Sequence, residues 1–419
     1  MSKFWSTGSS SSSSSSSLYF SSDDEDDDDN SSTNSTKSLI STAVDDPDLA
    51  WEQLGEQQSF LPPPTIISTS NEIKRECEPK AHTRIACISD THGAHRSFFV
   101  PPCDILIHGG DFTNTGEPCV VEDMSDYFGD LLSRNSHVSQ KQQKQQQPRV
   151  KHGIVCIAGN HELTFQPDHY EKVHDTFHPP KRGGRLDDQK ARGALTNCTY
   201  LQDGSCQIED TNIYGSPWTP EYHCWAFNLP RTDLGRVWDN IPDDTDVLIT
   251  HGPPLGRGDP HSRGIKSSAR LGCVDLLQQV QQRIQPRLHV FGHVHSGYGV
   301  TFDGTTLFVN ASAVSNDFAP RNPCIVVDLP KDGISPAVVV YPVCELSEEE
   351  ILDWFRRNEY HQVLFYLEDT LPRLRGDDVV KTKDVPFMDL VDRLRMHRDR
   401  DGREELCRAL LHLRADSYG

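Results

Sequence analysis

The chain reads Arg84-Ile-Ala-Cys-Ile-Ser-Asp-Thr-His92 where a short apolar run gives way to polar residues. The apolar and β-branched residues predict a strand, and Asp90 and His92, two residue types that bind metal ions, follow it directly. Similar apolar runs recur between residues 83 and 342, each followed by a polar or glycine-rich turn. They are Arg84–Ile88, Asp104–Ile107, Gly153–Ile157, Asp246–Ile249, Leu288–Phe291, Thr306–Val309 and Cys324–Val327.

These runs predict an α/β fold. Continuous apolar runs, unlike alternating ones, are typical of strands that helices cover on both faces. Helical stretches fit between the runs, notably Val274–Ile284. We therefore expect residues 81–342 to form one α/β domain.

Five of the predicted strands end in residue types that bind metal ions. The carboxyl ends of strands are where open α/β sheets place their sites, so these five loops are expected to converge. The glycines beside the ligand types permit tight turns and a close approach of the backbone. The strand ends read Ser89-Asp90-Thr91-His92, His108-Gly109-Gly110-Asp111, Ala158-Gly159-Asn160-His161-Glu162, Thr250-His251-Gly252-Pro253 and Gly292-His293-Val294-His295.

Each fragment alone is more typical of an ordinary turn than of a ligand. Five of them in order, each at a strand end, favour a metal site. A mixed nitrogen and oxygen ligand set without cysteine suits manganese, iron or zinc.

The motifs resemble those of the calcineurin-like metallophosphoesterase superfamily, whose signatures are D-x-H, G-D, G-N-H-[DE], G-H and G-H-x-H. The similarity runs from about Thr83 to Pro342, and it implies a β-sandwich flanked by helices. A closer resemblance is to the eukaryotic subgroup of metallophosphoesterase domain-containing proteins. It rests on the stretches Cys87-Ile-Ser-Asp-Thr-His92, Ile157-Ala-Gly-Asn-His-Glu-Leu-Thr-Phe165, Ile213-Tyr-Gly-Ser-Pro-Trp-Thr-Pro220 and Asn310-Ala-Ser312.

The resemblance implies two divalent metal ions. One would be held by Asp90, His92 and His295, the other by Asn160, His251 and His293, and Asp111 would bridge them. Some members of the subgroup replace the first histidine of the last motif with glycine, which weakens activity. His293 is present here, so the resemblance implies an active enzyme.

The implied reaction is hydrolysis of a phosphate ester. Two cations would neutralise the phosphoryl oxygens and lower the pKa of a shared water, and the resulting hydroxide would attack phosphorus in line. His161 is similar to the family's non-ligand histidine, which protonates the leaving oxygen, and Glu162 would orient its imidazole. The alternative for His161 is helix capping or packing.

Other side chains near these motifs have two interpretations each. His108 is either a second-layer contact of the metal site or a packed histidine at a strand end. Four residues before the fourth strand end either line a pocket for a base or pack in the core or a lid. They are Trp218, Trp225, Phe227 and Arg231.

Two classes of function remain. The first is a phosphodiesterase acting on a small substrate such as a cyclic nucleotide, because the subgroup that the chain resembles is linked with that activity. The alternative is an adaptor protein that retains the phosphoesterase fold. A nuclease is less favoured because the net charge is −21, whereas binding to a nucleic-acid polymer needs lysine and arginine to neutralise phosphates.

Composition predicts segments outside the α/β domain. Residues 1–80 hold a serine run, an acidic run and a proline cluster, which predict a disordered tail. A glutamine-rich stretch at about 135–150 reads as a loop insertion. Residues 345–416 have an amphipathic pattern that predicts a small all-α module. This module resembles a death-effector-type bundle, which would imply a protein partner; an unnamed helical module is the alternative.

The cysteines and the hydropathy pattern bear on location. The 12 cysteines are scattered without a C-x-x-C pair, which favours reduced thiols. The N-terminus lacks the apolar core of a signal peptide, and no apolar run approaches the ~20 residues that span a bilayer. We expect a soluble protein without membrane association, in the cytosol or, as the alternative, in the nucleus.

Overall fold

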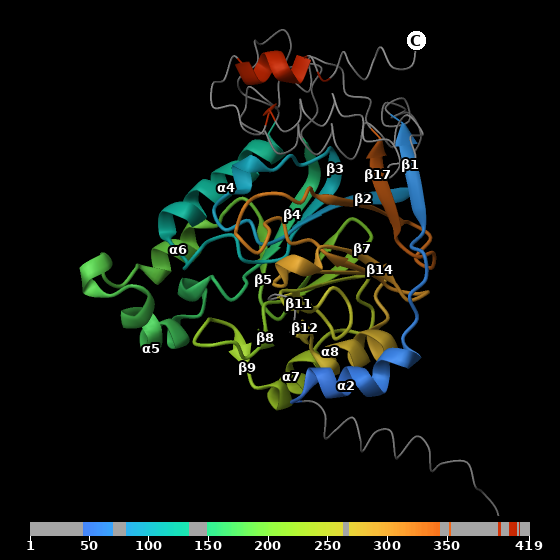
Figure 1. The fold of residues 1–419 in the computed structure, drawn as a ribbon, viewed down its shortest axis with the longest axis horizontal. Coiled ribbons are helices and arrows are strands. Elements are labelled where there is room, and N and C mark those ends of the chain that lie inside the picture. The colour runs from blue at the N-terminus through green and yellow to red at the C-terminus, as the bar shows by residue number, and fades with distance from the viewer. Residues whose placement is uncertain are drawn as a thin grey trace, which may run out of the picture. The chain divides into compact units, whose positions relative to one another are not determined.

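The computed structural model describes residues 45–69, 81–133, 149–262 and 268–343, together with residues 352, 393–394, 402–408 and 410. Within these residues two large β-sheets stand at the centre, and helices lie on their outer sides (Figure 1). The described residues belong to the second of two compact units, Ala43–Gly419.

The first sheet has seven strands. Its central strands β2, β3, β4 and β5 run parallel to one another. At the other side β16 pairs antiparallel with β2 and with β17, and β1 adds in parallel to β17. In spatial order the strands are β1 (Thr65–Thr69), β17 (Val338–Val343), β16 (Ile325–Pro330), β2 (His82–Ile88), β3 (Cys103–His108), β4 (Val150–Ile157) and β5 (Thr199–Leu201).

The second sheet has six strands. The strands β7, β10, β13 and β15 are parallel, and antiparallel strands close both edges. In spatial order they are β14 (Gly299–Phe302), β15 (Leu307–Asn310), β13 (Leu288–Phe291), β10 (Val247–Thr250), β7 (Thr211–Ser216) and β6 (Gly204–Ile208). Two short ribbons pair β8 (Thr219–Pro220) with β9 (Asn228–Leu229) and β11 (Pro260–Ser262) with β12 (Ser268–Arg270).

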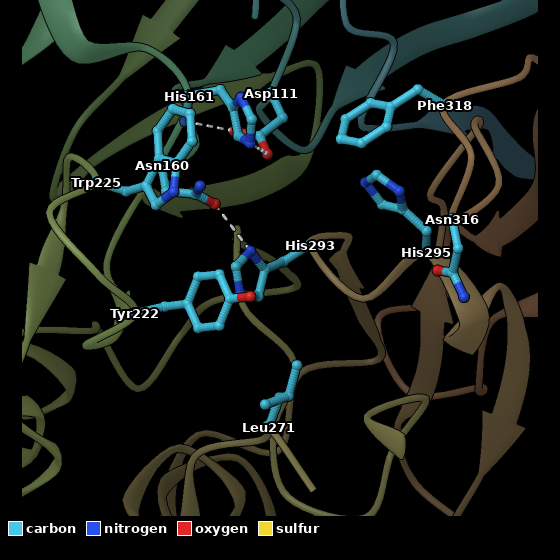
Figure 2. Close-up of a pocket in the computed structure, with 10 residues that line it drawn as sticks. All are labelled: Asp111, Asn160, His161, Tyr222, Trp225, Leu271, His293, His295, Asn316 and Phe318. Atoms are coloured by element: carbon cyan, nitrogen blue, oxygen red, sulfur yellow. Dashed lines mark hydrogen bonds and ion pairs between the residues drawn. The ribbon is translucent and has the colours of Figure 1, made fainter. Parts of the chain in front are cut away.

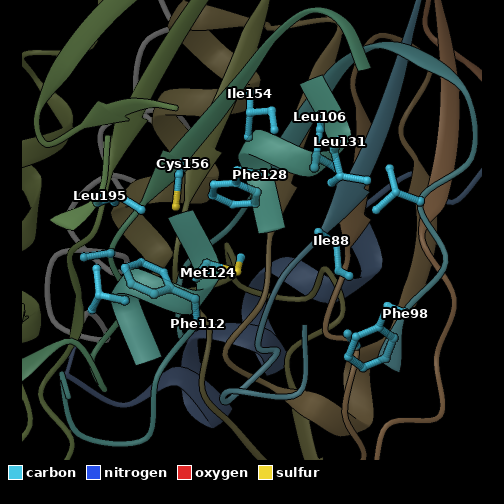
Figure 3. Close-up of a cluster of buried hydrophobic side chains, with 14 of the residues drawn as sticks. Ile88, Phe98, Leu106, Phe112, Met124, Phe128, Leu131, Ile154, Cys156 and Leu195 are labelled. Atoms are coloured by element: carbon cyan, nitrogen blue, oxygen red, sulfur yellow. The ribbon is translucent and has the colours of Figure 1, made fainter. Parts of the chain in front are cut away.

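Apolar side chains alternate between two cores along each central strand. In β2, Ile85 and Cys87 join a cluster that includes Val247 and Val290 of the second sheet, so the two sheets pack face to face. Ala86 and Ile88 belong instead to a cluster with the outer helices. Figure 3 shows Ile88 in this cluster. The helices of this cluster are α4 (Pro118–Leu132), α5 (Pro167–Phe177) and α6 (Asp188–Ala194).

A third cluster covers the outer face of the second sheet. It joins Leu234 and Trp238 of α7 (Arg231–Trp238) to Leu276 of α8 (Val274–Gln279) and to Leu248 of β10. A π-helix, η5 (Val280–Ile284), continues α8. Burying a leucine side chain such as Leu234 stabilises the fold by roughly 1.5–3 kcal/mol. The order of layers is therefore helix, sheet, sheet, helix.

The expected α/β class, the β-sandwich flanked by helices, the strands and the helix at Val274–Ile284 are confirmed. The expectation that helices cover both faces of the strands was wrong. One face of each sheet packs on the other sheet, because both faces of the central strands are apolar and each sheet offers an apolar face to its neighbour.

The predicted tail over residues 1–80 was also wrong in part. Residues 47–54 form the helix α2, the turn η1 (Gly55–Gln57) follows it, and β1 extends the first sheet. Long-range contacts hold this segment in place: Trp51 lies over the guanidinium of Arg270 at 3.9 Å. Residues 1–44 and 70–80 and the glutamine-rich residues 134–148 lie outside the described residues, as does most of the C-terminal module, of which residues 402–408 are helical.

Candidate metal centre

The seven predicted ligand residues converge at the carboxyl ends of strands from both sheets. Asp90 and His92 follow β2, Asp111 follows β3 and Asn160 follows β4 in the first sheet. The second sheet contributes three histidines, His251 after β10 and His293 and His295 after β13. The metal centre therefore lies where the two sheets meet.

One group of ligand atoms contains Asp90, His92, Asp111 and His295. Nε2 of His295 lies 3.4 Å from Oδ1 of Asp90 and 3.4 Å from Nε2 of His92. Nε2 of His92 lies 3.9 Å from Oδ2 of Asp111. Such spacings suit atoms that share one cation.

The second group contains Asp111, Asn160, His251 and His293. Nε2 of His251 lies 3.3 Å from Oδ2 of Asp111 and 3.0 Å from Oδ1 of Asn160. Nδ1 of His293 lies 2.8 Å from the same oxygen of Asn160. Oδ2 of Asp111 faces both groups, as the predicted bridging role requires.

The donor set fits two divalent cations. Carboxylate and imidazole atoms of Asp90, His92 and His295 lie within 4.8 Å of one another, and so do those of Asp111, His251 and His293. Imidazole with carboxylate suits first-row transition metals. Within the described part of the chain, the ion-pair partners of Asp90 and Asp111 are histidines alone. Two buried carboxylates without lysine or arginine leave negative charge for a cation to compensate.

Burial and mutual charge set the protonation of the metal-free centre. Burial lowers the pKa of His92 to about 4 and that of His293 to about 3, so both are neutral and able to bind metal near pH 7. Burial would also lower the pKa of His251, but the Asp111 carboxylate outweighs it and raises this pKa to about 9. Burial opposes ionisation of Asp111, yet His251 and His161 hold its pKa well below the ordinary value.

Several ligands sit on strained backbone. Asp90, His92, Asp111 and His293 have φ values of 54°, 45°, 52° and 65°, in the left-handed region that residues other than glycine rarely adopt. Backbone strain of this kind costs of order 1–3 kcal/mol per residue and persists where the surroundings enforce it, typically at functional sites.

The neighbouring glycines allow the close approach that was predicted. A Cβ at Gly159 would lie 2.3 Å from Oδ1 of Asp111 and 2.5 Å from Cε1 of His251. A Cβ at Gly292 would lie 1.9 Å from Oδ2 of Asp90. Both positions require glycine because the ligands occupy the space.

Hydrogen bonds on the far side of the ligands fix their orientation. Nδ1 of His251 contacts the carbonyl of Gly109 at 2.9 Å, and the hydroxyl of Ser312 donates to Oδ2 of Asp90 at 3.0 Å. His108 is buried, with Nε2 3.1 Å from Oγ1 of Thr91 and Nδ1 accepting from the amide of Gly110. His108 is thus a packed histidine whose hydrogen bonds also hold the backbone between candidate ligands. Both interpretations of this residue therefore apply.

His161 stands beside the centre with one nitrogen occupied. Its Nδ1 contacts the carbonyl oxygen of Asn114 at 2.7 Å, and its Nε2 lies 3.9 Å from Oδ2 of Asp111. The ring stacks on Trp225 with centroids 4.0 Å apart and 27° between planes. Because a carbonyl only accepts, Nδ1 carries a proton, and Nε2 is the atom left for chemistry.

The predicted contact between Glu162 and the imidazole of His161 is absent from the described residues. Glu162 is fully buried and accepts four hydrogen bonds, from the amides of Gly159, Asp111 and Thr113 and from the Thr113 hydroxyl. Burial and the Asp111 charge raise its pKa to about 8. Glu162 therefore ties two ligand loops together, and Asn114 orients His161.

A pocket of about 320 Å³ opens over the centre (Figure 2). Of the four pocket candidates, Trp225 alone lines it. Trp218 donates to Asp203 and packs on Phe227, which is buried. Arg231 donates to backbone carbonyls. The lining residues are Asp111, Asn160, His161, Tyr222, Trp225, Leu271, His293, His295, Asn316 and Phe318.

Sequence reasoning missed several of these residues. Asn114 acts through its backbone carbonyl, which any residue type offers. Phe318 lies in a loop after the last ligand, yet its ring centroid is 4.8 Å from that of His92 and 5.3 Å from that of His295. The sequence offers one feature that could have pointed to Phe318, namely an aromatic residue beside two polar residues, Asn316 and Asp317.

Comparison with known proteins agrees with the site. A family model described as calcineurin-like phosphoesterase matches residues 83–297. Metallophosphoesterase domain-containing protein 1 of Homo sapiens is 43% identical over 290 residues, which cover 68% of this chain and 82% of the relative. A UPF0046 protein of Caenorhabditis elegans is 35% identical over 299 residues, covering 68% of each.

Among solved structures, a purple acid phosphatase from yellow lupin seeds aligns with a TM-score of 0.34 at 12% identity. The alignment covers 63% of this chain and 54% of the phosphatase. No helix in the described residues combines the length and apolar character needed to cross a membrane.

Proposed function

The chain belongs to the calcineurin-like phosphoesterase family, and we propose that within it the protein is a phosphodiesterase of small substrates such as cyclic nucleotides. Metal-dependent hydrolysis of phosphoesters is the activity of the family, and the candidate ligands for it are present. The proposal concerns the ester class, the substrate and the residues that act on it.

The charge of the pocket lining carries the proposal. Its described lining residues include no lysine or arginine, so histidines and bound metal are the sources of positive charge. A phosphodiester has one negative charge and a monoester has nearly two near pH 7. A described lining without lysine or arginine therefore favours the diester, and the pocket volume of about 320 Å³ suits a ligand of mononucleotide size.

Two aromatic residues support a substrate with a planar group. Phe318 is 51% exposed, and its ring stands edge-on to the imidazoles of His92 and His295. Tyr222 lines another side of the pocket, beside His293 (Figure 2). An exposed aromatic ring at a pocket mouth offers stacking to a nucleobase, worth about 1–3 kcal/mol per base.

The residues would divide the work as follows. Asp90, His92 and His295 would hold one divalent cation, Asn160, His251 and His293 the other, and Asp111 both. When bound, the cations polarise the phosphoryl group and lower the pKa of water. His161 would donate a proton from Nε2 to the leaving oxygen, while Asn114 and Trp225 hold its ring. We include manganese, iron or zinc as the metals, since the donors suit all three.

The proposal includes an intracellular location. Free cysteines in the described residues include the exposed Cys119 and Cys224, and free thiols are typical of reducing compartments. The adaptor alternative depends on the C-terminal module, which lies mostly outside the described residues. It has no supporting observation among them.

Hydrolysis of a matched pair of aryl substrates tests the ester class. Bis(4-nitrophenyl) phosphate and 4-nitrophenyl phosphate release the same chromophore, so the two kcat/KM values compare directly. The proposal expects the diester to be preferred. A preference for the monoester would overturn the diester assignment and leave the family activity intact.

Cyclic nucleotides then test the planar group. Phe318→Ala is expected to raise KM for a cyclic nucleotide by about 5- to 100-fold, as the loss of one stacking contact predicts. Two references accompany this variant. Phe318→Leu keeps an apolar side chain but removes the ring, and the kcat/KM for bis(4-nitrophenyl) phosphate reports any general loss of activity. Equal KM values for wild type and Phe318→Ala would remove the nucleobase from the proposal.

A further inference from the structure

Arg257 is a buried cation that forms no salt bridge in the described part of the chain, and only the more distant charge of Asp303 opposes the effect of burial on its pKa. Its side chain is fully buried, and its Nε and Nη1 groups have no hydrogen-bond partner. Nη2 donates to the amide oxygen of Gln58 at 3.1 Å. The guanidinium carbon lies 4.3 Å from the ring centroid of Phe60 and 4.7 Å from that of Phe308. Aromatic rings thus hold the cation, but no carboxylate pairs with it.

Three other arginines of the domain pair with carboxylates. Arg84 forms two hydrogen bonds with Asp328, Arg287 pairs with Asp246 at 3.0 Å, and Arg283 pairs with Asp243. A buried charge is expensive unless it is paired and hydrogen-bonded. The exception at Arg257 therefore calls for a partner.

A cavity of about 140 Å³ adjoins Arg257. Thr301 also lines this cavity, and its buried hydroxyl has no hydrogen-bond partner either. Two side chains of one cavity thus offer donors that nothing in the described residues accepts. A ligand with several acceptor oxygens would satisfy them together, whereas a single-atom anion would satisfy fewer.

The cavity backs onto the last loop of the metal centre. Gly297 and Tyr298, which come two and three residues after His295 in the chain, form part of its wall. Asn310, also in the wall, donates its amide to the carbonyls of Gly258 and Val294 at 3.0 Å each. The side chain of Asn310 thereby joins the loop of Arg257 to the loop of His293 and His295.

We propose that this cavity binds a small oxyanion, a carboxylate or inorganic phosphate, through the guanidinium of Arg257 and the hydroxyl of Thr301. The site is separate from the metal centre and does not depend on the proposed substrate. An oxyanion bound there would neutralise the buried cation and brace the loop that carries His295.

Thermal unfolding of the manganese-loaded protein tests the site. Sodium phosphate and sodium acetate are titrated in parallel, with sodium chloride at the same ionic strength as reference. The Tm of the wild type is expected to rise by about 5 °C at a hundredfold excess over Kd. A rise in Tm with phosphate identifies phosphate as the ligand, and a rise in Tm with acetate identifies a carboxylate.

Variants separate this site from phosphate binding at the metals. Arg257→Met is expected to lose the oxyanion-dependent rise, apart from any part that comes from the metal centre. Arg283→Met, an arginine with its own carboxylate, keeps the full rise. Thr301→Val, which preserves side-chain shape, reduces the rise and decides the matter if Arg257→Met does not fold.

The proposal is overturned if the oxyanions shift the Tm of Arg257→Met as much as that of Arg283→Met. An unchanged rise in Thr301→Val, in the absence of folded Arg257→Met, has the same meaning. A rise with chloride as large as with either oxyanion would contradict the class of ligand.

Discussion

At the scale of residues, several side chains of the candidate metal centre lie on backbone conformations that their residue types rarely adopt. Asp90, His92, Asp111 and His293 adopt positive φ values, at a cost that the packing of both sheets must offset. Gly159 and Gly292 leave room that the carboxylates of Asp111 and Asp90 fill. Strained ligands beside obligatory glycines indicate that the geometry is held in place before metal binds.

Gly159→Ala tests this close approach. The new Cβ would lie 2.3 Å from Oδ1 of Asp111 and 2.5 Å from Cε1 of His251, so both ligands must move. We expect bound metal, measured by elemental analysis, to fall below half of the wild-type content, and hydrolysis to fall with it.

Gly193→Ala is the matched control, because a Cβ there meets nothing within 4 Å and the residue lies in α6. It should keep its metal and gain a little stability, since alanine favours a helix over glycine by up to about 1 kcal/mol. Full metal content and activity in Gly159→Ala would contradict the argument.

At the scale of elements, local patterns located the strands and long-range contacts located the rest. Each ligand-bearing strand was predictable because its apolar run and the ligand types after it are local features. The helix α2 was missed because its residues pack on the distant strand β12. Asp48 accepts a hydrogen bond from the amide of Arg270, and the guanidinium of Arg270 lies over the ring of Trp51. Composition alone carries no sign of such partners.

The same difference between local features and long-range contacts explains which residues of the candidate site could be predicted. Residue types at the strand ends predicted the seven candidate ligands, because metal chemistry selects side chains, and the family resemblance predicted His161. The role of Glu162 was mispredicted because its partners are backbone amides of Gly159, Asp111 and Thr113. Backbone partners leave no mark on the sequence.

Trp51→Ala tests whether α2 belongs to the folded domain. The ring contacts Arg270 and, at 6.3 Å between centroids, Phe60. We expect the free energy of unfolding, from urea titration, to fall by about 2 kcal/mol, as for loss of a partly buried aromatic residue with a cation–π contact.

Leu49→Ala, in the same helix and 43% exposed, should change the stability by less than about 0.5 kcal/mol. Equal stability of the two variants would mean that α2 contributes nothing to the domain.

At the scale of the whole molecule, buried neutral histidines make the fold sensitive to acid. Burial lowers the pKa of His108 and of His289 to about 3 each. The unfolded chain binds protons at these residues near pH 6.5, while the folded chain does not. The stability that depends on keeping these two histidines neutral is therefore fully present above about pH 6.5. It is lost as the pH falls from there toward 3.

His289→Gln should reduce this loss. The amide can keep a hydrogen bond to the Thr250 hydroxyl, which lies 2.8 Å from Nε2 of His289. We expect the slope of unfolding free energy against pH, between pH 6 and 4, to decrease by up to about 1.4 kcal/mol per pH unit. His223→Gln, at an exposed position, is the control, and identical slopes for the two variants would refute the assignment.

At this scale the candidate metal centre also draws its ligands from both sheets. The first sheet supplies the carboxylates, His92 and Asn160, and the second supplies His251, His293 and His295. Asp111, with Oδ2 facing both ligand groups, is the residue on which the paired site depends. Its loss should therefore disable the centre without removing any apolar contact.

The most direct test is the rate of bis(4-nitrophenyl) phosphate hydrolysis against Mn²⁺ concentration, for wild type, Asp111→Asn and His161→Ala. The account predicts saturable manganese-dependent turnover in the wild type and none above background in Asp111→Asn. In His161→Ala, kcat should fall by about 10²- to 10⁴-fold, with bound manganese unchanged. Equal rates in wild type and Asp111→Asn, with manganese bound to both, would contradict a metal-dependent phosphoesterase centred on Asp111.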